Sequence, residues 1–164
     1  MKTAAMVSLI VHALLGLAVI GWIIAANPKI YAKPAKGPWL SPLEMVYYVV
    51  GIASVLLGWY FNIKFVAEAH GQGNLISGPA SYPEFIKGQF ATPACGSGNQ
   101  DYMIANVILM PVFTIIDGYR RGLRRPWLFL ASSFFTSFAF PFAFYFATME
   151  RQRRHEQARE AITA

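Results

Sequence analysis

The chain has 164 residues, of which 55% are hydrophobic and only 13% are charged, and its mean hydropathy is +0.40. This composition excludes an ordinary water-soluble domain and indicates a protein folded in a lipid bilayer. The formal net charge is +6. We expect the bilayer, and not a nucleic acid, as the partner of this chain.

Four apolar stretches are long enough to cross about 30 Å of hydrocarbon at about 1.5 Å per residue. They predict an all-α, polytopic membrane protein in which four transmembrane helices form one bundle, a single membrane domain. The expected helices cover about residues 6–26, 43–67, 101–117 and 127–150. The third is short and contains Asn106 and Pro111, which favour a helix that is tilted, kinked or extended into the neighbouring polar residues.

The first apolar run has one alternative interpretation. Lys2, with the small residues Ala25 and Ala26, is typical of a cleaved signal peptide. The run is longer than the roughly 7–15 residues of a signal-peptide core, so we interpret it as a transmembrane helix.

Capping residues mark the helix starts. Ser41 and Glu44 form a capping box at the second helix, in which each side chain satisfies a backbone amide of the other residue. Ser97 or Asn99 is the expected cap of the third helix. Asp101 then lies in its first turn, where the helix dipole stabilises an anion.

Two stretches are expected outside the bilayer. The strap, residues 27–42, has four prolines and three lysines, which favours a semi-extended segment along the headgroups through Lys29, Lys33 and Lys36. The long loop, residues 71–100, has six glycines and three prolines. Long loops are usually functional or disordered, so if the protein binds a ligand or partner outside the bilayer, this loop is the expected place.

The excess of Lys and Arg that normally marks the cytoplasmic side does not decide the orientation of four helices. The side with both termini and the long loop has seven: Lys2, Lys64, Lys87, Arg151, Arg153, Arg154 and Arg159. The other side also has seven: Lys29, Lys33, Lys36, Arg120, Arg121, Arg124 and Arg125. The charged extension after Met149 favours a cytoplasmic C-terminus.

No catalytic or metal-binding pattern is present in the sequence. The single cysteine, Cys95, cannot form an intramolecular disulfide, and the three histidines lie on different predicted elements. We predict no metal and no cofactor, with a hydrophobic pigment or lipid as the alternative. An enzyme would need Asp101, Asp117 and His70 to converge under the folded loop, so a non-catalytic protein is favoured.

Polar residues inside the predicted helices require partners. His12 is interpreted as a contact between helices or with headgroups, although Gly16 one turn later would leave room for a flat macrocycle. Asn62 is expected to reach Asn106 or the long loop. The fourth helix has phenylalanines all round, so many are expected to face lipid or a polyene ligand.

Four stretches carry a family resemblance: WYFNIKF at Trp59–Phe65, Asp101 after the Thr92–Ala94 turn, DGYRRG at Asp117–Gly122, and SFAFPFAFYFATMER at Ser137–Arg151. Together they resemble the small bacterial membrane proteins grouped as domain of unknown function 2834, from about Tyr47 to Arg153. Thr92, Cys95 and Asp117 depart from the family pattern. The resemblance implies the membrane fold, and because the family has no assigned activity it implies none here.

Asp117 lies at the C-terminal end of the third helix, where the dipole disfavours an acid by about 0.3–1 kcal/mol. Arg120 and Arg121 follow it closely, which favours a clasp that fixes the turn between the third and fourth helices. Arg124 and Arg125 are then available for lipid phosphates or for the acidic face of a partner.

These patterns favour an accessory or assembly subunit of a larger membrane complex, in contact with other membrane subunits or with further copies of itself. The alternative is a small membrane binder or carrier of a lipid, polyene or other hydrophobic molecule, indicated by the phenylalanines and by Asn62 and Asn106.

Overall fold

The structure, a computed structural model, describes residues 3–70, 72–73 and 76–163, and in these residues all regular structure is helical. The elements are α1 (Thr3–Ala26), α2 (Pro28–Tyr31), α3 (Pro42–Glu68), α4 (Tyr82–Gln89), α5 (Pro93–Met103), the π-helix η1 (Ile104–Leu109), α6 (Met110–Arg120), α7 (Trp127–Ser133) and α8 (Ala139–Thr163). The prediction of an all-α fold is confirmed.

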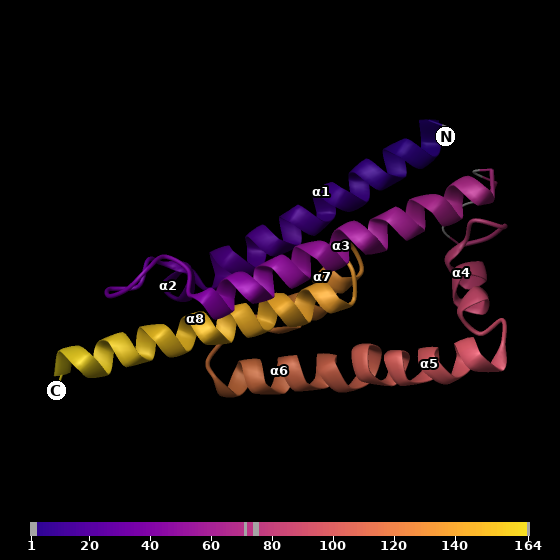
Figure 1. Cartoon of the computed structure of the whole chain (residues 1–164). Coiled ribbons are helices and arrows are strands. Elements are labelled where there is room, and N and C mark those ends of the chain that lie inside the picture. The colour runs from indigo at the N-terminus through magenta and orange to yellow at the C-terminus, as the bar shows by residue number, and fades with distance from the viewer. Residues whose placement is uncertain (1–2, 71, 74–75, 164) are drawn as a thin grey trace.

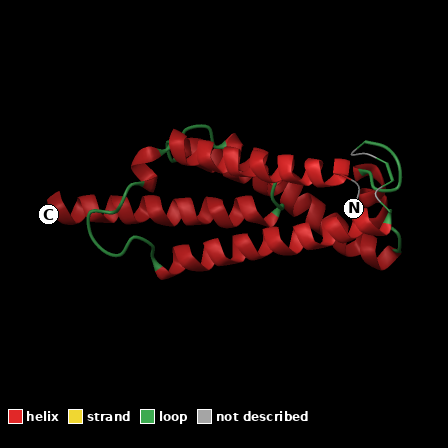
Figure 2. Cartoon of the chain, turned by 90° about the horizontal axis from the view of Figure 1, so that it is seen from above, coloured by secondary structure: helices red, strands yellow, loops and turns green. Residues whose placement is uncertain are grey.

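Within the described residues, three helical stretches are long and apolar enough to cross a membrane: Leu9–Ala26, Pro42–Glu68 and Pro93–Arg120. The long helices lie roughly side by side along one axis (Figures 1 and 2). α8 packs against α3, α7, α2 and α6. We call the end with α2, the strap and the α6–α7 turn the strap end, and the end with α4 the loop end. The N-terminus lies at the loop end and the C-terminus at the strap end.

The prediction of one continuous helix over residues 127–150 is wrong. α7 starts at the strap end, where Trp127 contacts Trp22 of α1 at 5.9 Å between ring centroids. It ends about halfway along α1, where the backbone of Phe135 packs on Gly16. The chain turns at residues 134–138, and α8 returns to the strap end. α7 and α8 therefore form a helical hairpin, which we call the α7–α8 hairpin.

Hydroxyl groups support the turn of this hairpin. The Ser132 carbonyl accepts the amides of Phe135 and Thr136 at 3.1 Å, and the Thr136 hydroxyl donates to the same carbonyl at 2.7 Å. Ser137 Oγ accepts the Phe140 amide at 3.2 Å and shares a hydrogen bond of 2.8 Å with Ser54 Oγ of α3. These local bonds compete with helix continuation and satisfy backbone groups where water is scarce.

The hairpin also changes where the phenylalanines lie. Phe129, Phe140 and Phe144 are buried in the core with Tyr145, because α8 is enclosed by its neighbours. Phe134, in the turn, is 66% exposed. The expectation that many of these rings face lipid or a polyene is wrong for the buried ones.

The long loop is shorter than predicted. It contains α4, and the third long helix begins at Pro93, with Thr92 Oγ1 accepting the Cys95 amide at 3.2 Å. Asp101 is therefore in the third turn of α5 and not in the first. The third helix thus extends into the neighbouring polar residues, and near Asn106 it is interrupted by the π-helix η1, which ends just before Pro111, a residue without an amide hydrogen to donate.

Gly118 gives a test of the packing at the α6–α7 turn. A Cβ at this position would lie 2.5 Å from Pro126 Cβ, so we expect Gly118→Ala to lower the free energy of unfolding by about 1–3 kcal/mol. Gly98→Ala is the control, because no atom lies within 4 Å of its added Cβ and alanine favours helix by up to about 1 kcal/mol. Thermal unfolding in detergent, followed by tryptophan fluorescence, measures both. Equal stability of the two variants would contradict this packing.

Candidate functional site

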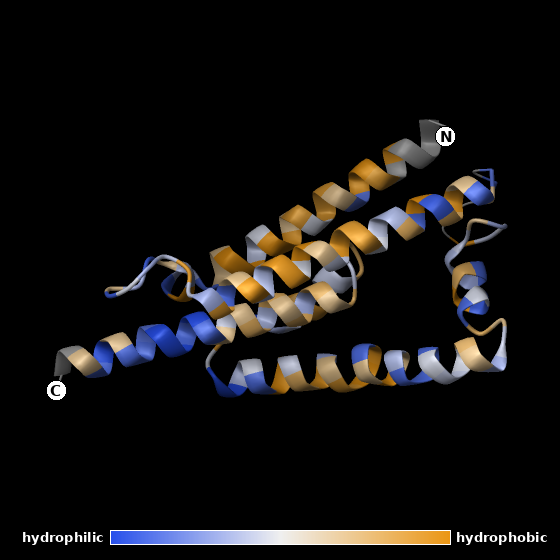
Figure 3. Ribbon diagram, in the orientation of Figure 1, coloured by the Kyte–Doolittle hydropathy of each residue, from blue (hydrophilic) through white to orange (hydrophobic). Residues whose placement is uncertain are grey.

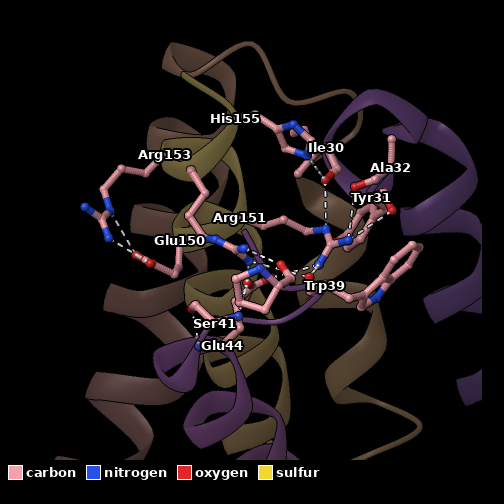
Figure 4. Close-up of polar contacts among 12 residues, drawn as sticks. Ile30, Tyr31, Ala32, Trp39, Ser41, Glu44, Glu150, Arg151, Arg153 and His155 are labelled. Atoms are coloured by element: carbon pink, nitrogen blue, oxygen red, sulfur yellow. Dashed lines mark hydrogen bonds and ion pairs between the residues drawn. The ribbon is translucent and has the colours of Figure 1, made fainter. Parts of the chain in front are cut away.

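Arg151 of α8 is buried at the strap end, with 2% of its surface exposed. Its Nε donates to the Ile30 carbonyl at 2.9 Å, and its Nη2 donates to the carbonyls of Tyr31 at 3.3 Å and Ala32 at 3.1 Å. Nη1 donates to the Trp39 carbonyl at 3.0 Å, and the guanidinium lies 5.2 Å from the centroid of the Trp39 ring. One side chain thus holds both ends of the strap (Figure 4).

Glu44, in the first turn of α3, is the carboxylate partner of Arg151. The two pair at 2.9 Å between Arg151 Nη1 and Glu44 Oε1, and the Glu44 side chain is fully buried. Glu44 Oε2 accepts the Ser41 amide at 2.8 Å and also pairs with Arg154. The capping box at Ser41 and Glu44 is confirmed, and its carboxylate has this second function. Burial of two charges is tolerated because nearly every donor and acceptor is satisfied.

Further bonds join the strap to α8. The Thr148 hydroxyl donates to the Phe144 carbonyl, so the Tyr31 hydroxyl donates to Thr148 Oγ1 at 2.7 Å. Burial raises the pKa of Tyr31 and keeps it a neutral donor. His155 Nε2 donates to the Ile30 carbonyl at 3.0 Å. The strap is a fixed part of the fold.

The predicted clasp is formed by Asp117 with Arg121, but with a partner that the sequence did not indicate. Asp117 Oδ2 accepts Arg121 Nε at 2.7 Å and the Tyr145 hydroxyl at 2.6 Å. The hydrogen bond to Asp117 raises the pKa of the Arg121 guanidinium. Arg120 has an exposed side chain and makes no hydrogen bond to another described side chain. Tyr145 ties the clasp to α8, and its distance of 28 positions from Asp117 left no local signal.

Of the residues predicted to contact headgroups or a partner, some also pack within the fold and the others have exposed side chains. Asn27 Oδ1 accepts the Arg124 amide at 2.8 Å, and Asn27 Nδ2 donates to the Arg124 carbonyl at 3.1 Å. The Arg125 guanidinium lies 5.1 Å from the centroid of the Trp22 ring. The remaining predicted cations have exposed side chains: Lys29, Lys33, Lys36 and Arg124.

The three polar residues predicted inside the long helices, His12, Asn62 and Asn106, do not contact one another in the described part of the chain. The His12 ring packs edge-on against Phe135, which, with Thr136, fills the room beside Gly16. Asn62 is exposed on α3. Asn106 Nδ2 donates to the Tyr102 carbonyl at 2.9 Å, so the expected contact between Asn62 and Asn106 is absent among the described residues.

The structure also keeps Asp101 and Asp117 apart. Sixteen residues of nearly continuous helix separate them, which is about 24 Å at about 1.5 Å per residue. His70 follows α3 at the loop end, whereas Asp117 lies at the strap end. Asp101, Asp117 and His70 therefore do not converge as the enzyme hypothesis requires. Among the described residues, no group of three or more His, Cys, Asp or Glu could hold a metal ion.

The sequence of α3 to α8 matches a family described as a protein of unknown function, DUF2834, over residues 46–151. The chain belongs to the DUF2834 family. The matched DUF2834 region begins at residue 46 and ends at Arg151. It therefore excludes α1, the strap and Glu44, which come earlier in the chain. No curated protein and no solved structure matches the chain.

Removal of Glu44 tests whether the Arg151 pair holds the strap onto the DUF2834 region. Glu44→Ala leaves a buried guanidinium without its carboxylate, so we expect a loss of about 3–5 kcal/mol in the free energy of unfolding. We also expect faster tryptic cleavage in the strap after Lys36, because Lys33 is followed by proline and resists trypsin. Glu68→Ala is the control, because its pair with Lys64 is exposed and worth at most about 1 kcal/mol. Similar stability and cleavage rates in both variants would rule out this role.

Proposed function

We propose that this DUF2834 protein is a non-catalytic accessory or assembly subunit of a larger membrane complex and docks through its strap end. The observation that carries the proposal is the gathering of cations there. Eleven of the fourteen Lys and Arg residues belong to strap-end elements: Lys29, Lys33, Lys36, Arg120, Arg121, Arg124, Arg125, Arg151, Arg153, Arg154 and Arg159. Lys64 and Lys87 lie toward the loop end, and Lys2 precedes α1.

The α7–α8 hairpin is the reason for this asymmetry. With four helices crossing the membrane, the numbers of Lys and Arg on the two sides would be equal. With three crossing helices, the α7–α8 hairpin enters and leaves at the strap end, so the charged part of α8 lies beside the strap (Figure 3). Because Lys and Arg accumulate on the cytoplasmic side, we propose that the strap end faces the cytoplasm of a bacterial inner membrane. The C-terminus is then inside and the N-terminus outside.

The strap end suits a protein partner because its exposed cations stand on a fixed backbone. Arg151 and Asn27 hold the segments that carry Lys29, Lys33, Lys36 and Arg124. Preorganised charges lose little conformational entropy on binding, and complementary charge steers the acidic face of a partner into position. Only 11% of the apolar stretch of α1 and 6% of that of α3 is buried within the chain, which leaves helix surface for neighbouring subunits or further copies.

Thiol labelling tests the orientation. Cys95 is exposed at the loop end and reports on that side, while Ala161→Cys in a Cys95→Ala background reports on the end of α8. In intact spheroplasts we expect a membrane-impermeant maleimide to label Cys95, and to label the cysteine at position 161 only after permeabilisation. Labelling of both from one side would support four spans, and the reverse pattern would overturn the orientation.

Charge removal tests the docking role. In the quadruple variant Lys29→Gln, Lys33→Gln, Lys36→Gln and Arg124→Gln, we expect about tenfold less of the co-purifying membrane subunits. Four exposed ion pairs of about 0.4 kcal/mol each correspond to that factor. Lys64→Gln with Lys87→Gln, at the loop end, is the control and should leave recovery unchanged. Purification in mild detergent that yields the wild-type chain with lipid alone would contradict the proposal.

The second candidate function, a binder or carrier of a hydrophobic molecule, also has a supporting observation. A groove at the strap end has apolar and charged side chains in its wall, from Leu43 of α3 to Glu156 of α8. The charged part favours a lipid with a polar headgroup over a polyene.

A further inference from the structure

A groove of about 220 Å³ opens on α8 between the first turns of α3 and the α6–α7 turn. Its apolar wall is formed by Leu43, Tyr47, Phe146 and Met149, and its charged wall by Arg121, Glu150, Arg153 and Glu156. The rings of Tyr47 and Phe146 are 5.7 Å apart between centroids. Along α8 the apolar residues come first and the charged ones follow toward the C-terminus, so the groove passes from bilayer depth to headgroup depth.

We propose that this groove binds one zwitterionic phospholipid that has a primary amine in its headgroup. The phosphate lies between Arg121 and Arg153, the ammonium contacts Glu156, and the start of an acyl chain packs on Tyr47 and Phe146. This site is independent of the accessory role, because it requires only the fold of the single chain.

The donors for a phosphate are present in the groove. Arg121 uses its Nε for Asp117, and its Nη1 and Nη2 make no hydrogen bond to another described residue. Arg153 uses Nε and Nη2 for Glu150, so its Nη1 is available. Guanidinium groups bind phosphate oxygens through parallel N–H bonds, and these pairs strengthen at the edge of a low-dielectric phase.

The acceptors in the groove favour an amine. Glu156 Oε1 accepts Gln152 Nε2 at 3.2 Å, and Glu156 Oε2 has no donor among the described residues. An ammonium group supplies three N–H donors, whereas a choline headgroup supplies none. Two arginines and two glutamates make the lining neutral overall, so an anionic headgroup without an amine gains less than a zwitterionic one.

The remaining volume fits this assignment. A space of about 220 Å³ is smaller than the roughly 300–1,000 Å³ of pockets that enclose a whole drug-sized ligand. It holds a headgroup and the first carbons of a chain, and the rest of the lipid stays in the bilayer beside α3. Burial of these carbons against the apolar wall adds a hydrophobic contribution.

Native mass spectrometry of the full chain tests the proposal. The delipidated protein is titrated separately with phosphatidylethanolamine, phosphatidylglycerol and phosphatidylcholine of identical acyl chains. We expect phosphatidylethanolamine to bind at least tenfold more tightly than the other two. Equal binding of the three lipids would overturn the proposal.

Four variants assign the contacts. Arg121→Gln with Arg153→Gln should lower phosphatidylethanolamine binding about tenfold, and Glu156→Gln, which leaves the Asp117 clasp intact, should remove the preference over phosphatidylcholine. Arg120→Gln is the matched control, because Arg120 adjoins Arg121 but does not line the groove. Leu43→Trp, which fills the groove without a change of charge, should lower binding of phosphatidylethanolamine.

Two results from these variants would overturn the assignment. Equal losses in Arg120→Gln and in the double variant would indicate general attraction to a basic surface. If Leu43→Trp removes a co-purifying protein but leaves lipid binding intact, the occupant is a partner helix and not a phospholipid.

Discussion

The strap end depends on one constraint: the guanidinium of Arg151 is buried and must be fully hydrogen-bonded. Its five acceptors come from the strap and from Glu44, so the chain between α1 and α3 has essentially one arrangement that satisfies it. That arrangement fixes the start of α3 against α8. It also sets the backbone that carries the exposed lysines of the strap, and the first turns of α3 that form one wall of the groove.

The second constraint is the turn of the α7–α8 hairpin, because it decides at which end α8 emerges. The turn is held by hydrogen bonds of Ser132, Thr136 and Ser137 to its backbone. It packs on Gly16 of α1 and is hydrogen-bonded to Ser54 of α3. With the turn in place, the charged half of α8 meets the strap and the α6–α7 turn. The gathering of cations at the strap end and the groove both depend on this return, since α8 adds its arginines to the cations of the strap and forms part of the groove wall.

Local chemistry explains which parts of the candidate site could be predicted. The pairs Ser41 with Glu44 and Asp117 with Arg121 are three and four residues apart, so helix geometry alone brings them together. Arg151 and Tyr145 were missed because their partners are 107 and 28 positions away. An arginine at the border between the apolar and the charged half of α8 was a signal that an acid lies nearby, but it did not identify Glu44.

The sequence by itself indicated that the chain folds in a lipid bilayer, that it is helical, where α3 starts and to which family it belongs. It could do so because the length of an apolar run, the capping residues and the DUF2834 stretches are local properties. Only the tertiary structure decided that residues 127–150 turn back. An apolar run long enough to cross a bilayer has the same composition whether it continues or folds, and the hydroxyls of SSFFTS turn the chain only where α1 and α3 enclose them. The end of the molecule at which α8 meets its partners therefore follows from packing and not from hydropathy.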